Sequence, residues 1–140
     1  MSTAATSSAP NKAFVIALWI AQVLLFATFT MSGFMKLTAP IPELSAMMPW
    51  TGELSETFVR FIGLIDLAGG FGVLLPALTR IQPRLSVLAA LGIIVLQVLA
   101  IFFHASRVEW SVLPLNLVLL SLAVFVFWGR YRKAPIETRW

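Results

Sequence analysis

Four apolar stretches, each about as long as a lipid bilayer is thick, constrain the fold of this chain more than any other feature. They cover residues 13–35, 58–79, 85–106 and 110–129, and only the second contains charged residues, Arg60 and Asp66. A helix needs about 20 apolar residues to cross a hydrocarbon core of roughly 30 Å. Because backbone groups cannot remain unpaired in hydrocarbon, each stretch must form a helix. The sequence therefore predicts an all-α fold, a four-helix transmembrane antiparallel bundle.

The composition is typical of a membrane protein and removes several kinds of chemistry. Hydrophobic residues make up 59% of the 140 residues and charged residues 11%, whereas soluble domains are about 45–50% apolar and about 25% charged. The chain has no Cys, which excludes disulfides, thiolate nucleophiles and Cys-ligated clusters. It has a single His, His104, which excludes a multi-His metal site or bis-His haem site within one chain. We therefore expect no metal and no covalently bound cofactor.

The placement of Lys and Arg predicts the orientation in the membrane. Seven of the ten lie on the side that holds both termini and the second loop, and three lie on the other side. The first group is Lys12, Arg80, Arg84, Arg130, Arg132, Lys133 and Arg139, and the second is Lys36, Arg60 and Arg107. The positive-inside rule then places both termini in the cytoplasm. We expect the membrane to be a bacterial inner membrane. These cations fit anionic lipid in the bilayer rather than a nucleic acid.

The same spans divide the chain into three parts. We expect residues 1–12 to be a disordered cytoplasmic leader, residues 13–130 the membrane domain and residues 131–140 a basic cytoplasmic tail. Prolines and an apolar run in the first loop, residues 37–57, predict a lid or a short interfacial helix on the outer surface. Ser55, followed by Glu56, is typical of the start of the second helix.

Polar side chains inside the spans gather in the outer half, and the inner half contains almost none. An Asp near the membrane centre costs about 2.5–3.5 kcal/mol on insertion scales, so Asp66 needs a partner, a proton or water. We expect a ligand site between the helices in this half, under the first loop. The candidate ligand-binding residues are Lys36, Arg60, Asp66, Gln97, His104 and Asn116.

Each candidate also has a structural interpretation. Asp66 would hold the bundle together by pairing with Lys36 or Arg60. Gln97 and Asn116 would form hydrogen bonds between helices, and the glycine-rich face of the second helix would serve close packing.

Several short motifs resemble those of DoxX-like membrane proteins. Residues 32–37 are similar to the family's G-x-x-K-L ending of the first helix, and residues 60–70 resemble its G-x-x-E-x-x-G second helix. Residues 72–76 match its G-x-L-L-P, and residues 100–104 its A-x-x-x-H. Asn116 and Gly129–Arg130 resemble its fourth helix and exit, so that the likeness covers residues 14–130. The family usually carries Glu where this chain has Asp66, whose side chain reaches about 1.5 Å less.

The resemblance implies a four-helix integral membrane protein in a quinone-linked setting, since the family is named for a small subunit of a thiosulfate:quinone oxidoreductase. The first hypothesis is a subunit of a membrane redox system that binds a small apolar ligand such as a quinone. Under this hypothesis the electrons come from a redox partner subunit or from the substrate. The alternative is a non-catalytic accessory or scaffold membrane protein in which Asp66 joins helices. A carrier formed by a homo-oligomer is a third hypothesis. The residues leave open whether the chain is an enzyme.

Overall fold

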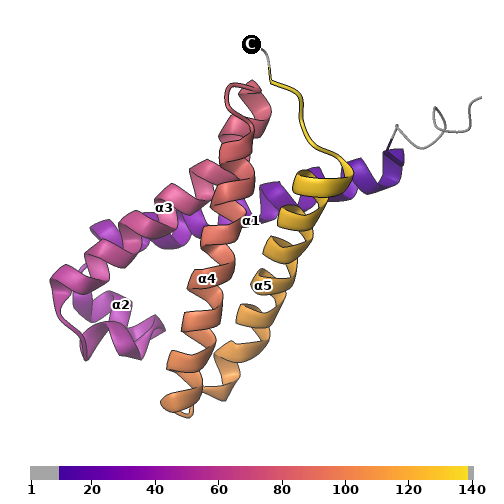
Figure 1. The fold of residues 1–140 in the computed structure, drawn as a ribbon. Coiled ribbons are helices and arrows are strands. Elements are labelled where there is room, and N and C mark those ends of the chain that lie inside the picture. Colours follow the sequence, from indigo (N-terminus) through magenta and orange to yellow (C-terminus); the bar gives the residue numbers. More distant parts are fainter. Residues whose placement is uncertain (1–9, 139–140) are drawn as a thin grey trace, which may run out of the picture.

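The computed structural model describes residues 10–138, and in that part of the chain the secondary structure is helical throughout (Figure 1). The predicted leader therefore lies almost wholly outside the described residues. The five α-helices are α1 (Lys12–Thr38), α2 (Ile41–Met47), α3 (Glu56–Thr79), α4 (Arg84–Ser106) and α5 (Leu113–Trp128). Three shorter helices are η2 (Pro49–Gly52), η3 (Trp110–Val112) and the π-helix η4 (Gly129–Lys133).

Four helical segments are long and apolar enough to cross a membrane, which confirms the predicted fold class. They are Lys12–Thr38, Glu56–Thr79, Arg84–Ser106 and Trp110–Lys133, and each covers one predicted span. Much of their surface is apolar and exposed, including Ile20 at 56%, Phe34 at 61% and Phe102 at 70%. Side chains of this size on the outside of every helix are what a lipid-facing surface requires.

Polar side chains fix where the first and third helices begin. The side chain of Asn11 accepts a hydrogen bond from the Ala13 amide at 2.7 Å. Ser55 accepts one from the Phe58 amide at 3.2 Å, which confirms the predicted cap of α3. Both caps satisfy amide groups that the first turn of a helix leaves without an internal partner.

The four spans pack as two antiparallel pairs that meet at one end and diverge at the other. Helix α1 lies along α3, and α4 lies along α5, while α3 also contacts α4. In Figure 1, α1 crosses behind the α4–α5 pair obliquely, and the free ends of the two pairs lie on either side of α2. We call the end that holds α2 the outer end. The opposite end, where Phe14 of α1 contacts Phe125 and Trp128, is the inner end.

The predicted short helix in the first loop is confirmed as α2, and with η2 it joins the two pairs at the outer end. Leu44 and Thr51 are fully buried. The ring of Trp50 lies edge-on to that of Phe103 on α4, with centroids 6.0 Å apart. The loop therefore fills part of the space that opens where the helix pairs diverge.

Candidate functional site

The centre of the outer half is a buried ion pair between α1 and α3. Lys36 Nζ lies 2.7 Å from Asp66 Oδ2, and the Ser32 hydroxyl donates a hydrogen bond of 3.1 Å to the same oxygen. Asp66 is 2% exposed. Of the two partners that the sequence allowed for Asp66, the structure selects Lys36.

Two glycines bring this pair together. A Cβ atom at Gly33 would lie 2.6 Å from the carbonyl oxygen of Gly63, so the helix backbones almost touch there. Lys36 follows Gly33 by one helical turn, and Asp66 follows Gly63 by one turn on the antiparallel partner. Because the helices are antiparallel, Lys36 and Asp66 lie one turn to either side of this contact. Each side chain tilts toward the N-terminus of its own helix, and therefore back across the contact toward the other. The glycine-rich face therefore serves helix packing, as its structural interpretation predicted.

Arg60 lies at the edge of this centre and binds the end of α1. Its guanidinium Nη1 donates to the carbonyl oxygens of Lys36 at 2.8 Å and Ala39 at 2.7 Å, and Nη2 pairs with Glu56 at 2.9 Å. The last carbonyl groups of a helix have no internal partners and carry partial negative charge. Arg60 thus caps α1 beside the ion pair.

His104 belongs to a different cluster, which we call the outer cap: Glu53, His104, Arg107 and Glu109. His104 Nδ1 lies 2.8 Å from Glu109 Oε1, and Arg107 Nε donates to that same oxygen at 3.0 Å. Both terminal nitrogens of Arg107 donate to the Glu53 carboxylate, at 3.0 and 2.7 Å. The outer cap therefore fastens the end of η2 to the α4–α5 connection.

Aromatic rings lie between the outer cap and the ion pair. Lys36 Nζ lies 5.5 Å from the Trp50 ring centroid, and Trp50 contacts Phe103, whose centroid is 5.3 Å from that of His104. The acid and the amine thus meet directly. The imidazole is separated from them by two aromatic side chains.

The electrostatics of the outer cap predict a dependence on pH. The hydrogen bond from Arg107 lowers the pKa of Glu53, and the hydrogen bond with His104 lowers the pKa of Glu109. A folded-state pKa below the ordinary value of 4.5 means that these contacts stabilise the fold above that pH and are lost as the pH falls through the lowered values. We expect Trp50 to become solvent-exposed as the pH falls below the ordinary value of 4.5 and through the lowered pKa values of these two carboxyl groups.

This expectation is checked by the fluorescence difference between the native chain and Trp50→Phe, titrated from neutral to acid pH. Arg107→Gln removes the cation that Glu53 and Glu109 share. The Trp50 fluorescence of this variant at pH 7 should therefore already be that of a first loop detached from the outer cap. A transition that is the same in Arg107→Gln would show that the outer cap does not hold the loop.

Gln97 and Asn116 are buried side chains with one polar atom each that lacks a partner. They are 5% and 8% exposed, and neither Gln97 Oε1 nor Asn116 Nδ2 has a hydrogen-bond partner. A buried polar atom left unsatisfied costs about 1–3 kcal/mol. The structural interpretation, a hydrogen bond between helices, does not account for these two atoms.

A groove lies between α3 and α4, and Gln97 is not among the residues that line it. It has a volume of about 220 Å³ and an almost wholly apolar lining. Its wall includes Ile93, one turn before Gln97 on the same helix, and Ile65, which directly precedes Asp66. The other lining residues are Ala68, Gly69, Ala89, Gly92 and Leu96.

The expectation of an almost apolar inner half is wrong. Gln22 is fully buried there and donates to the Val73 carbonyl oxygen at 2.7 Å. Arg130, 5% exposed, donates through Nε to Gln22 Oε1 at 2.8 Å and lies 4.7 Å from the Trp19 ring centroid. Ser86 is also buried at this end. Gln22, a polar residue in the middle of the first apolar stretch, was the signal that could have revealed this cluster.

Four apolar spanning helices with lipid-facing surfaces define an integral membrane protein. The chain belongs to the DoxX-like family, whose model matches residues 20–126. This match confirms the family resemblance that the short sequence motifs indicated. No curated protein and no solved structure matches the chain.

Proposed function

We propose that this protein is a subunit of a membrane redox system and binds a small apolar ligand of the quinone class in its outer half. The observation that carries the proposal is the unsatisfied pair of buried polar atoms, the acceptor Gln97 Oε1 and the donor Asn116 Nδ2. The free-energy cost of leaving these two atoms without hydrogen bonds is removed by a ligand that offers one acceptor and one donor inside an apolar site.

The reduced form of a quinone meets both requirements. One hydroxyl oxygen of a quinol accepts a hydrogen bond from the Asn116 amide, and the other hydroxyl donates one to the Gln97 carbonyl oxygen, whereas the oxidised form can only accept the bond from Asn116. The groove between α3 and α4 offers an apolar surface for the ring or the first part of the tail. A Cβ added at Gly92 would meet no atom within 4 Å, so this side of the groove is open.

The ion pair supplies the second part of the proposal. Reduction of a quinone to a quinol consumes two electrons and two protons, and in this proposal Lys36 and Asp66 relay the protons from the aqueous phase, with Arg60 and His104 at the rim of the site. The chain has no Cys and one His. The electrons therefore come from a partner subunit or from the substrate.

The proposal places the inner end in the cytoplasm of a bacterial inner membrane. The described residues at that end include six cations, and Glu137 is the one acid among them. The cations are Lys12, Arg80, Arg84, Arg130, Arg132 and Lys133. Such an excess supports a cytoplasmic location.

Quinone binding is tested by titrating the purified protein with decylubiquinone and following Trp fluorescence. Gln97→Leu and Asn116→Leu should each weaken binding about tenfold, because each loses one buried hydrogen bond worth roughly 0.5–1.5 kcal/mol and narrows the site. Ser121→Ala, an exposed position on α5 whose hydroxyl bonds Leu117 of its own helix, is the control and should bind normally. Absence of saturable binding to the native chain would reject the proposal.

A second function is favoured by the completeness of the ion pair. Asp66 is satisfied by Lys36 and Ser32, next to a tight glycine contact. That arrangement supports a non-catalytic accessory or scaffold protein, in which the pair joins α1 and α3.

A further inference from the structure

A second cavity lies at the inner end, far from the outer cap. It has a volume of about 550 Å³ and lies between the start of α1 and the end of α5. This volume is within the range of roughly 300–1,000 Å³ that is typical of ligand pockets. Its lining consists of Pro10, Asn11, Ala13, Phe14, Trp128 and Lys133.

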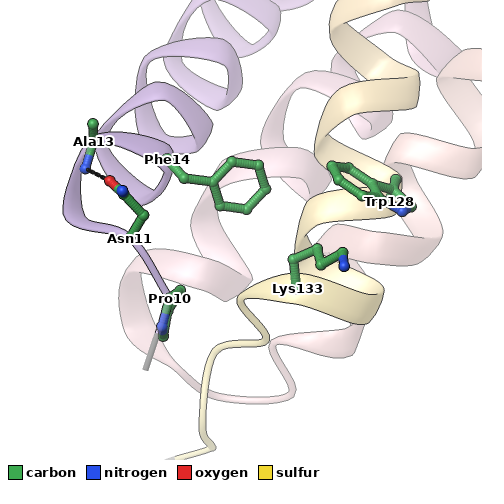
Figure 2. Close-up of a pocket in the computed structure, with 6 residues that line it drawn as sticks. All are labelled: Pro10, Asn11, Ala13, Phe14, Trp128 and Lys133. Atoms are coloured by element: carbon green, nitrogen blue, oxygen red, sulfur yellow. Dashed lines mark hydrogen bonds between the residues drawn. The ribbon is translucent and has the colours of Figure 1, made fainter. Parts of the chain in front are cut away.

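The walls of this cavity differ in chemistry. Figure 2 shows the Phe14 ring directed from α1 toward Trp128, with Lys133 beneath Trp128 and Asn11 on the opposite side. The two rings meet edge to face, with centroids 5.8 Å apart. Lys133 Nζ lies 5.4 Å from the Trp128 ring centroid, and its exposed stem allows the ammonium to reach the cavity. One wall is thus aromatic, and another carries a mobile positive charge.

The positive charges around the cavity are only partly compensated within the described residues, where Glu137 is the one acid at this end. Arg130, on the same short helix as Lys133, has no carboxylate partner in residues 10–138, and its Nη2 has no hydrogen-bond partner. Arg132 and Lys12 add further positive charge beside it. A buried cation without an acid keeps its field, so the inner end attracts anions.

We infer that this cavity binds one anionic phospholipid. The phosphate pairs with Lys133 at the cavity mouth, within the positive field of the inner end, and the first part of an acyl chain packs on Phe14 and Trp128. Trp at a membrane–water interface, with its ring apolar and its edge polar, suits this junction of headgroup and chain. A free phosphate ion would use the charge but leave the aromatic wall uncovered. The inference does not depend on the proposed quinone site.

The test is native mass spectrometry of the full chain in detergent, with phosphatidylglycerol, phosphatidylcholine or inorganic phosphate added. We expect phosphatidylglycerol to bind at least fivefold more tightly than phosphatidylcholine, and inorganic phosphate not to be retained. Lys133→Gln should weaken phosphatidylglycerol binding about fivefold, the contribution of one cation at an anionic lipid surface.

Arg132→Gln is the matched control, because it removes the same charge from the same helix at a residue that does not line the cavity. Its effect should be less than twofold. Ala13→Phe places a second ring in the cavity without changing charge and should weaken phosphatidylglycerol binding at least fivefold, while far-UV circular dichroism confirms its fold. Equal losses in Lys133→Gln and Arg132→Gln, unchanged binding in Ala13→Phe, or equal binding of the two lipids would overturn the inference.

Discussion

Asp66→Asn should lower the free energy of unfolding by about 3–5 kcal/mol, the cost of breaking a buried ion pair by removing one partner. Asp66 is 2% exposed and lies 2.7 Å from Lys36 Nζ. The substitution leaves the ammonium buried without a counter-charge among the described contacts of α1 and α3. Titration with sodium dodecyl sulfate in detergent micelles, followed by circular dichroism, measures the change. A variant that stays within about 1 kcal/mol of the native chain would contradict it.

The double variant Lys36→Met with Asp66→Leu removes both charges and should recover most of that loss. Replacing a buried pair by apolar residues of similar volume is often neutral or stabilising. The non-additivity of the single and double variants reports the coupling between the two side chains.

The same double variant separates the two functions, because its fold is restored while its ionisable groups are gone. A subunit that uses the pair to exchange protons with a quinone should lose turnover of its redox complex. A scaffold should retain both the complex and its turnover. Recovery of stability together with turnover would assign Lys36 and Asp66 to helix packing alone.

Gly33→Ala should destabilise the protein by about 3 kcal/mol, at the upper end of the usual range for overpacking of roughly 1–3 kcal/mol. The added Cβ would lie 2.6 Å from Gly63 O and 2.8 Å from the Leu67 amide nitrogen. Both are backbone atoms, so α1 and α3 must separate to make room. That separation also lengthens the Lys36–Asp66 contact one turn away.

Gly92→Ala is the matched control for this substitution, because nothing lies within 4 Å of the Cβ position at Gly92. It should leave stability unchanged or raise it by up to about 1 kcal/mol, the helix preference for Ala over Gly. Both variants are compared in the same denaturant titration. Equal effects would show that the close contact of α1 and α3 is not required.

The sequence was sufficient for the spans and for one of the caps. Apolar runs of bilayer length appear as helices with little change, and Ser55 caps α3 where its pattern indicated. These features depend on local composition, because a single helix in lipid satisfies its backbone hydrogen bonds without contacts to the rest of the chain. The presence of a short helix in the first loop followed from the same kind of local signal.

The pairing of side chains could be predicted only in part. From the sequence, either Lys36 or Arg60 could pair with Asp66. The close contact between Gly33 and Gly63 selects Lys36. His104 was expected to join them, but Glu109, five residues further along the chain, holds it in the outer cap instead. Several cations lie near each acid, and their order along the chain does not say which one is in reach.

By itself, the sequence determined the number and approximate length of the membrane spans and the excess of positive charge at one end, because hydrophobicity and the positive-inside bias act on each segment separately. Only the tertiary structure decided that Arg130 reaches back to Gln22, 108 positions away, and that the helix pairs diverge around Trp50. It also placed the inner cavity between the first and last spans. These features depend on the crossing geometry of helices, which small residues and side-chain shapes fix after the spans have formed.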